Sequence, residues 1–140
     1  MQNNLFYYKH IIPDAMTSLK LKQLQFEIDG WKRLFDFMTD ENIQQKNRLA
    51  EILKDKFDKN LLGEVENFQS SFLVEDELIG VLRNEVAEMD KLLLPEEFNN
   101  IEINKETGEK LNILRENIMI AEKQFGNLKF EFNFFLSKNI

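Results

Sequence analysis

Three stretches of this 140-residue chain carry apolar side chains at alternating intervals of three and four residues, and this spacing constrains the fold more than any other feature. Strands repeat every two residues, so a sustained 3–4 spacing is typical of helices that pack along their length. We therefore predict an all-α antiparallel bundle of three long helices with coiled-coil-like packing, at about residues 14–58, 61–94 and 105–138. The seams comprise Leu21, Leu24, Ile28, Trp31, Phe35 and Met38; Leu61, Val65, Phe68, Phe72, Glu75, Ile79, Leu82, Val86, Met89 and Leu93; and Leu111, Leu114, Ile118, Ala121, Phe125, Leu128, Phe132 and Phe135.

The segment FGNLKFEFNFFL, residues 125–136, is the one place where two periods compete. Phe130, Phe132 and Phe134 alternate with polar residues, as they would in a half-buried strand. The helical frame that starts at Leu111 instead selects Phe132 and leaves Phe130 and Phe134 outside the seam. Because this frame is established well upstream and no turn signal precedes the alternation, we predict a helix here, with Phe130 and Phe134 as surplus apolar surface.

The first helix allows two interpretations at Thr39. If its frame continues past Met38, the next seam positions are Asn42, Gln45, Leu49 and Ile52. If a new helix starts after an N-cap at Thr39, the apolar face becomes Ile43, Ala50, Leu53 and Phe57. No Gly or Pro forces a break, so the sequence predicts either one long helix, straight or kinked near residue 39, or two helices.

The two prolines fall at plausible helix boundaries. Pro13 precedes the first helical pattern, where Asp14 is a candidate N-cap, and Pro95 follows the second. No Gly/Ser-rich linker divides the rest of the chain. We therefore predict an N-terminal arm at residues 1–13 and a single helical-bundle domain at residues 14–140.

The composition excludes several classes of function. With no cysteine, the chain cannot form disulfides, thiolate metal sites or a cysteine nucleophile. No apolar run approaches the roughly 18 residues that span a bilayer, and the first residues do not resemble a secretory signal. We expect a cytoplasmic protein without a membrane partner.

The charge is negative and unevenly distributed. The formal net charge of −7 argues against a nucleic-acid partner, because phosphate binding requires an excess of Lys and Arg. Residues 61–109 hold 13 acidic and three basic side chains, whereas the rest of the chain holds 12 acidic and 15 basic ones. This asymmetry indicates either an acidic helix packed beside more basic ones or an acidic face that attracts a basic partner.

No motif points to catalysis or to a cofactor. His10 is the only histidine, so neither a histidine metal site nor the Glu-x-x-His pairs of a diiron bundle can form. Gly-rich phosphate loops are absent, and the consecutive acids at 75–77 do not form a calcium loop. Trp31 occupies a seam position and is expected in the core. We predict a protein that is not an enzyme and binds no cofactor or metal.

Glu75 is the one acidic residue in a long apolar seam, where its neighbours predict an apolar side chain. Three interpretations remain open. Residues 70–77 could form a local bend that turns Glu75 toward water. Glu75 could instead form a buried ion pair with Arg48 or Arg115, or it could be a functional acid in a pocket.

The apolar side chains outside the seams suggest an interface. Ile113, Ile120 and Phe134 recur at a third heptad position, which a helix touching two neighbours would bury. Phe37 and Phe130 lie outside even this wider stripe, and the N-terminal arm adds further apolar residues, so either the arm folds back over the bundle or two chains share this surface. We favour the second arrangement and predict a non-enzymatic interaction protein (a scaffold, adaptor or assembly subunit) that forms a homodimer. An alternative is a small acidic chaperone or inhibitor that holds a basic or hydrophobic client through residues 61–109. The predicted interface residues are Phe6, Tyr7, Tyr8, Ile11, Ile12, Phe130 and Phe134.

Overall fold

The computed structural model describes residues 13–55, 58–93 and 105–139. These residues form three long helices, α2 (Pro13–Lys54), α3 (Leu62–Leu92) and α5 (Lys105–Asn139), and one 3₁₀ turn, η1 (Lys59–Leu61). No strand occurs in the described ranges. The predicted all-α bundle of three long helices is confirmed. The predicted N-terminal arm lies outside the described residues except for Pro13, which α2 includes.

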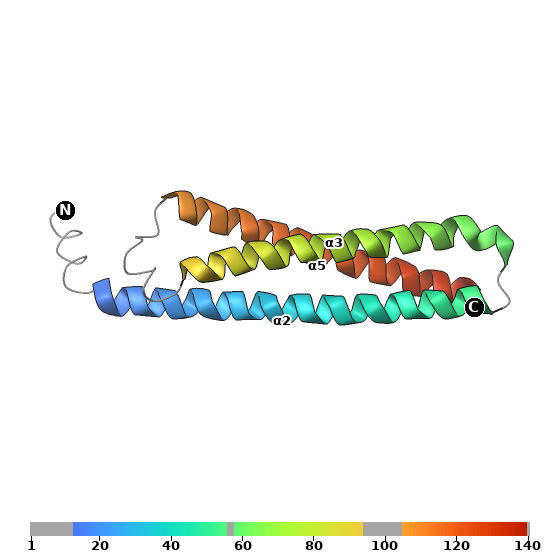
Figure 1. Ribbon diagram of the computed structural model, residues 1–140, viewed down its shortest axis with the longest axis horizontal. Helices are drawn as coiled ribbons and strands as arrows, with labels where there is room; N and C mark the ends of the chain where they lie inside the picture. Colours follow the sequence, from blue (N-terminus) through green and yellow to red (C-terminus); the bar gives the residue numbers. More distant parts are fainter. Residues whose placement is uncertain (1–12, 56–57, 94–104, 140) are drawn as a thin grey trace.

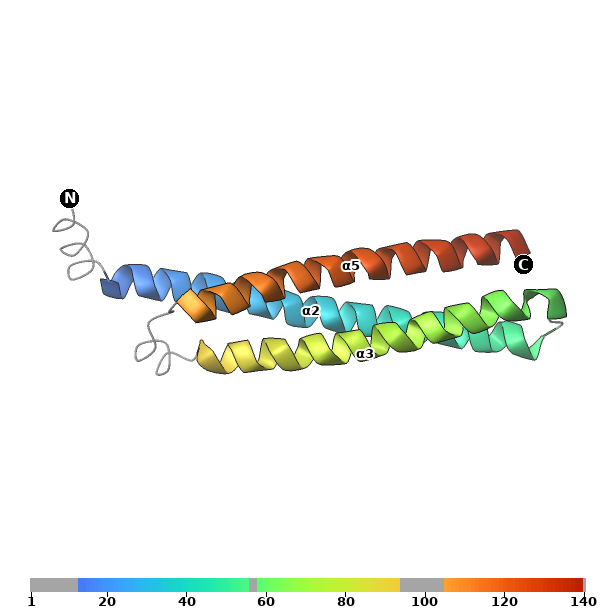
Figure 2. The same ribbon diagram turned by 90° about the horizontal axis from the view of Figure 1, so that it is seen from above.

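The helices lie side by side along their length (Figures 1 and 2). Ion pairs join Lys32 to Asp90 and Lys46 to Asp76, so residue numbers rise along α2 while they fall along the facing side of α3. The pairs Glu27–Arg115 and Glu41–Lys129 instead rise together. Thus α3 runs opposite to α2, and α5 runs in the same direction as α2.

The first helix does not break at Thr39. Asn42 and Gln45 are buried, whereas Ile43 is 46% exposed and Leu53 is 42% exposed. The frame that begins at Leu21 therefore continues through residue 45, and the two-helix interpretation is wrong. The suggested cap at Asp14 is also wrong, because α2 already includes Pro13, whose fixed φ suits the first helical turn.

A tight connection joins α2 to α3. The side chain of Asp58 accepts a hydrogen bond of 2.9 Å from the backbone N–H of Asn60, which caps η1. Helix α3 follows η1 directly. Because this connection is short, the two long helices lie alongside each other in opposite directions.

The C-terminal segment is helical through all of its phenylalanines. Phe132 is fully buried, while Phe130 is 71% exposed and Phe134 is 53% exposed. The helical frame therefore predicts the burial of this segment correctly, and the alternating interpretation fails.

The buried apolar side chains form two clusters separated by polar residues. The larger cluster includes Met38, Ile79 and Phe125, and Trp31 packs against it. The smaller one comprises Leu49, Val65, Phe72, Phe132, Phe135 and Leu136. Between the two clusters, α2 contributes Asn42 and Gln45 and α3 contributes Glu75, which are the buried polar residues of the described chain. We call these three residues the polar layer.

Candidate functional site

Glu75 lies in the polar layer with no hydrogen-bond partner for its buried Oε2 atom among the described residues. Its side chain is 6% exposed, so the prediction of a local bend that turns it toward water is wrong. Burial raises the pKa of Glu75, and the nearby charge of Asp76 raises it further. The 3–4 frame of α3 continues without a stutter and carries the acid into the core.

Asn42 anchors α2 to α3 beside Glu75. Its Nδ2 atom donates to the backbone carbonyl of Phe72 at 2.9 Å and also to a carboxylate oxygen of Asp76. The other oxygen of Asp76 accepts a hydrogen bond of 2.6 Å from Lys46 Nζ. This network was not predicted, although two successive polar residues at seam positions of α2 were a usable signal for it.

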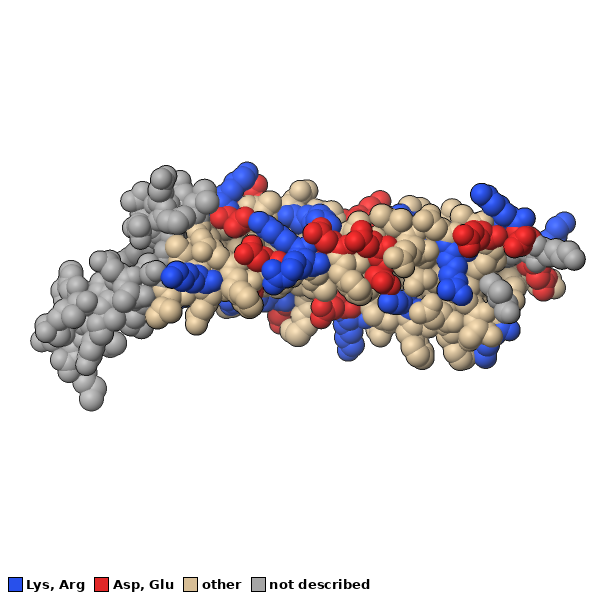
Figure 3. Space-filling view, turned by 90° about the horizontal axis from the view of Figure 1, so that it is seen from below, with Lys and Arg blue, Asp and Glu red and all other residues tan. Residues whose placement is uncertain are grey.

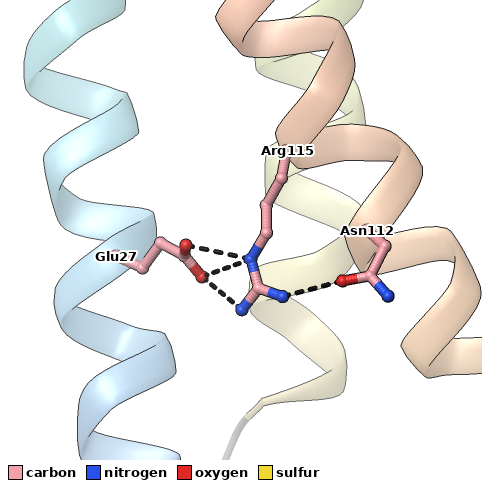
Figure 4. A network of polar contacts seen from close by, with 3 residues as sticks. All are labelled: Glu27, Asn112 and Arg115. Carbon is pink, nitrogen blue, oxygen red and sulfur yellow. Dashed lines mark hydrogen bonds and ion pairs between the residues drawn. The ribbon is translucent and has the colours of Figure 1, made fainter.

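Neither arginine proposed as a partner of Glu75 contacts it. Figure 4 shows Arg115 of α5 binding Glu27 of α2, with its Nε and Nη2 atoms 2.8–3.1 Å from the carboxylate, and donating to Asn112. Arg48 is exposed. Arg115 precedes Phe132 by 17 residues, or about 25 Å along the helix, and Phe132 contacts Phe72, one turn from Glu75. Arg115 is therefore too far along the bundle to reach Glu75, and the predicted buried ion pair is wrong.

The Asn42 network makes a direct prediction about stability. We expect Asn42→Ala to lower the free energy of unfolding by about 1–3 kcal/mol, because the carbonyl of Phe72 loses its side-chain donor and the buried amide leaves a cavity. The matched control is Ile43→Ala, at a half-exposed neighbouring position, which should change stability by about 0.5 kcal/mol or less. Urea denaturation followed by circular dichroism measures both. Equal losses in the two variants would contradict the role assigned to Asn42.

The three helix–helix contacts, which we also call seams, differ in whether ion pairs cross them. Ion pairs link α2 to α3 at three places and α2 to α5 at two. Within residues 13–55, 58–93 and 105–139, no ion pair joins α3 to α5. Ring contacts hold these two helices together instead, such as Phe72–Phe132, whose centroids are 5.0 Å apart.

The outer side of this third seam carries exposed apolar residues at seven-residue spacing. Asp76 and Arg83 of α3 pair with α2, and so do Arg115 and Lys129 of α5. A residue two positions earlier on a helix lies about 160° around the axis, and so faces away from α2. Apart from Asn127, the positions in this phase from 74 to 81 and from 113 to 134 are apolar and 53–62% exposed: Val74, Val81, Ile113, Ile120 and Phe134. We call these five residues the α3–α5 face.

This observation corrects one expectation and adds two residues. Contact with two neighbours could have buried the stripe of Ile113, Ile120 and Phe134, but these residues point outward from the bundle, and Phe134 is exposed as its prediction as surplus apolar surface requires. The core of a three-helix bundle is narrower than the apolar stripe of α5. Val74 and Val81 were not predicted as surface residues of interest, although their seven-residue spacing outside the seam was a usable signal.

A shallow groove lies between the start of α3 and the end of α5. Its lining includes Glu64, Phe68, Leu128, Phe134 and Lys138. The rings of Phe130 and Phe134 are stacked, with centroids 6.4 Å apart, and Lys138 Nζ lies 4.6 Å from the Phe134 centroid. The structure therefore brings together the two predicted interface residues of α5 at the edge of this groove.

The remaining predicted site residues cannot be placed. Phe6, Tyr7, Tyr8, Ile11 and Ile12, together with His10, lie outside the described residues. Phe37 of α2 is 52% exposed; its ring contacts Phe125 edge-on and lies 5.8 Å from Lys129 Nζ.

The faces of the bundle also differ in charge. Seen from below, where α2 is nearest, Lys and Arg are interspersed with Asp and Glu (Figure 3). Helix α3 differs, with eight acidic and two basic side chains in residues 62–92. Eight of the 13 acidic residues of segment 61–109 therefore lie on α3, which borders the seam that lacks ion pairs.

The described residues contain no group of three or more His, Cys, Asp or Glu side chains arranged to bind a metal. Nor does any helix among them combine the length and the apolar character needed to cross a bilayer.

Comparisons with protein-family models, curated proteins and solved structures find no match to this chain. Its function has to be inferred from its own residues.

Proposed function

We propose that this protein is a non-enzymatic interaction protein, such as a scaffold, adaptor or assembly subunit, that binds another polypeptide along the α3–α5 face. The observation that carries this proposal is the difference between the seams. Ion pairs bridge both seams of α2, whereas the third seam presents five half-exposed apolar side chains to solvent. Several exposed apolar side chains on one side of a bundle are typical of an interaction site.

Two kinds of partner suit this face. The exposed Phe130–Phe134 stack favours self-association into a homodimer, because a two-fold dimer is the commonest way to bury such a patch. The acidic excess of α3 favours a basic or hydrophobic client, as a small chaperone or inhibitor would hold. A cytoplasmic location remains part of the proposal, on the basis of the absence of cysteine.

Site-specific photocrosslinking in the native host tests the proposal. A photoreactive phenylalanine analogue replaces Phe134 on the α3–α5 face or, as the control, Phe26 on α2, which is 74% exposed. We expect a discrete crosslinked protein band from position 134 and none from position 26, because only the first lies on the proposed contact surface. Adding Ile120→Glu should abolish the band, since a charge there has to be desolvated on binding.

The mass of the crosslinked species identifies the kind of partner. A band at twice the mass of the chain means a second copy, and any other discrete mass means a different protein. Equal crosslinking from positions 134 and 26, or no discrete band from either, would overturn the proposed function.

A further inference from the structure

Building on the proposed function, we propose that the α3–α5 face binds an amphipathic helix whose apolar stripe is bordered by Lys and Arg, completing a four-helix bundle. The face is elongated and runs along two helices, as the seven-residue spacing of its members requires. A helix laid along such a face inserts apolar residues at every third or fourth position.

The edge of the face on α3 is acidic and has unpaired charges. Glu77 and Glu85 lie four residues before and after Val81, on the same side of the helix. Both are exposed, and neither forms an ion pair within the described ranges. Of the two basic residues of α3, Arg83 is bound to Asp36 and Thr39 of α2 and so cannot neutralise them.

On α5, the charged residues next to Phe134 are mixed in sign. Glu131 precedes Phe134 by three residues, and Lys138 follows it by four and lies over its ring. The field across the face is therefore most negative along α3. A bound helix would gain most by placing its Lys and Arg on the side that faces α3 and its apolar residues over Val81 and Ile120.

A second copy of this chain suits the face less well. A two-fold interface uses the same patch on both subunits, so Glu77 and Glu85 of each copy would enter one interface. Like charges brought together at an interface oppose association. Charge complementarity therefore selects a basic helix rather than the same acidic surface.

Binding of two synthetic peptides to the full chain tests this inference. Both are about 28 residues long, or four heptads, with the same apolar stripe; one has Lys and Arg beside the stripe and the other has Glu. By fluorescence anisotropy, we expect the basic peptide to bind roughly tenfold or more tightly than the acidic one at about 50 mM salt. We expect this preference to shrink several-fold at about 500 mM salt, because exposed charges are screened.

Two matched double variants assign the effect to the proposed edge. Glu77→Gln with Glu85→Gln should weaken binding of the basic peptide several-fold and leave the acidic peptide unweakened. Asp29→Asn with Asp40→Asn removes the same charge from exposed positions on α2 and should leave the preference unchanged. Phe134→Ala should weaken both peptides, because it removes apolar contact area.

The outcomes separate this inference from the proposed function. Equal binding of both peptides, or an equal effect of the two double variants, would overturn the choice of a basic partner. A stable dimer of this chain at micromolar concentration that Phe134→Glu dissociates would also overturn it, while supporting an interaction function for the face. If neither peptide binds, the inference fails even where crosslinking from position 134 succeeds.

Discussion

Replacement of Phe132 by alanine should remove about 3–5 kcal/mol from the free energy of unfolding. Phe132 is fully buried in the smaller apolar cluster. Its ring centroid lies 5.0 Å from that of Phe72 and 5.2 Å from that of Phe68, with both pairs in edge-to-face geometry. The variant loses the transfer free energy of a phenyl ring and these ring contacts, and leaves a cavity that long helices cannot close without bending.

Phe130→Ala is the matched control, two residues earlier on the same helix. Phe130 is 71% exposed, so its loss should change stability by about 0.5 kcal/mol or less. Urea denaturation followed by circular dichroism gives both values from one kind of experiment. Comparable losses for Phe130 and Phe132 would mean that the two side chains share an environment, as alternating strand residues do, and would contradict the helical packing of the last segment.

The contrast between Phe130 and Phe132 also explains why the burial pattern of α5 could be predicted from the sequence. The spacing from Leu111 onward fixes the rotational phase of the helix before Phe130 and Phe132 are reached. The rotational phase alone then assigns Phe132 to the core and Phe130 to solvent. The same logic places Asn42 in the core, because the phase set at Leu21 is carried through Thr39 without a break.

Partners across the helices could not be predicted in this way. A heptad pattern determines which face of a helix is buried but not how far one helix is displaced along its neighbour. Arg115 was one of two candidate partners for Glu75, but the axial register places it beside Glu27. Lys46 and Asp76 meet for the same reason, and nothing in either local sequence specifies that offset.

The width of the apolar stripe on α5 was a second feature whose burial the sequence could not predict. Ile113 and Ile120 have the spacing expected of a helix that touches two neighbours, and α5 does touch both α2 and α3. In the observed packing, however, the seam positions and Leu136 fill both contacts. A wide apolar stripe is therefore compatible with burial inside one chain and with burial by a partner. Only the three-dimensional structure shows which residues of the stripe the chain itself buries.

The polar layer has an energetic consequence of its own. Asn42 satisfies its amide by bonding to α3, whereas Glu75 has a buried oxygen without a partner. A polar group in a helical core lowers stability but can fix the register, because displaced arrangements leave it unsatisfied. Asn42 suits that role, and Glu75 supplies the larger penalty.

Glu75→Leu should accordingly raise the free energy of unfolding by about 1–4 kcal/mol at neutral pH, the range seen when buried charged groups are replaced by apolar ones. Leucine has nearly the same length and would join the apolar clusters on either side. The two-state analysis of urea denaturation applies to a single bundle of this size. The control is Glu77→Leu, two residues further along on the exposed side of α3, where little change is expected.

The pH dependence of the stability gained by replacing Glu75 distinguishes the cost of a buried acid from a simple packing effect. Because the pKa of Glu75 in the folded state is raised above its ordinary value of 4.5, the folded protein holds this proton more tightly than the unfolded chain. The penalty from Glu75 is therefore absent below about pH 4 and grows as the pH rises toward the folded-state pKa. We expect the stability difference between Glu75→Gln and the unmodified protein to be small near pH 4 and to increase toward pH 7. A difference that stays constant over this interval would show that Glu75 ionises in the bundle as readily as in the unfolded chain, and the polar layer would then be open to water.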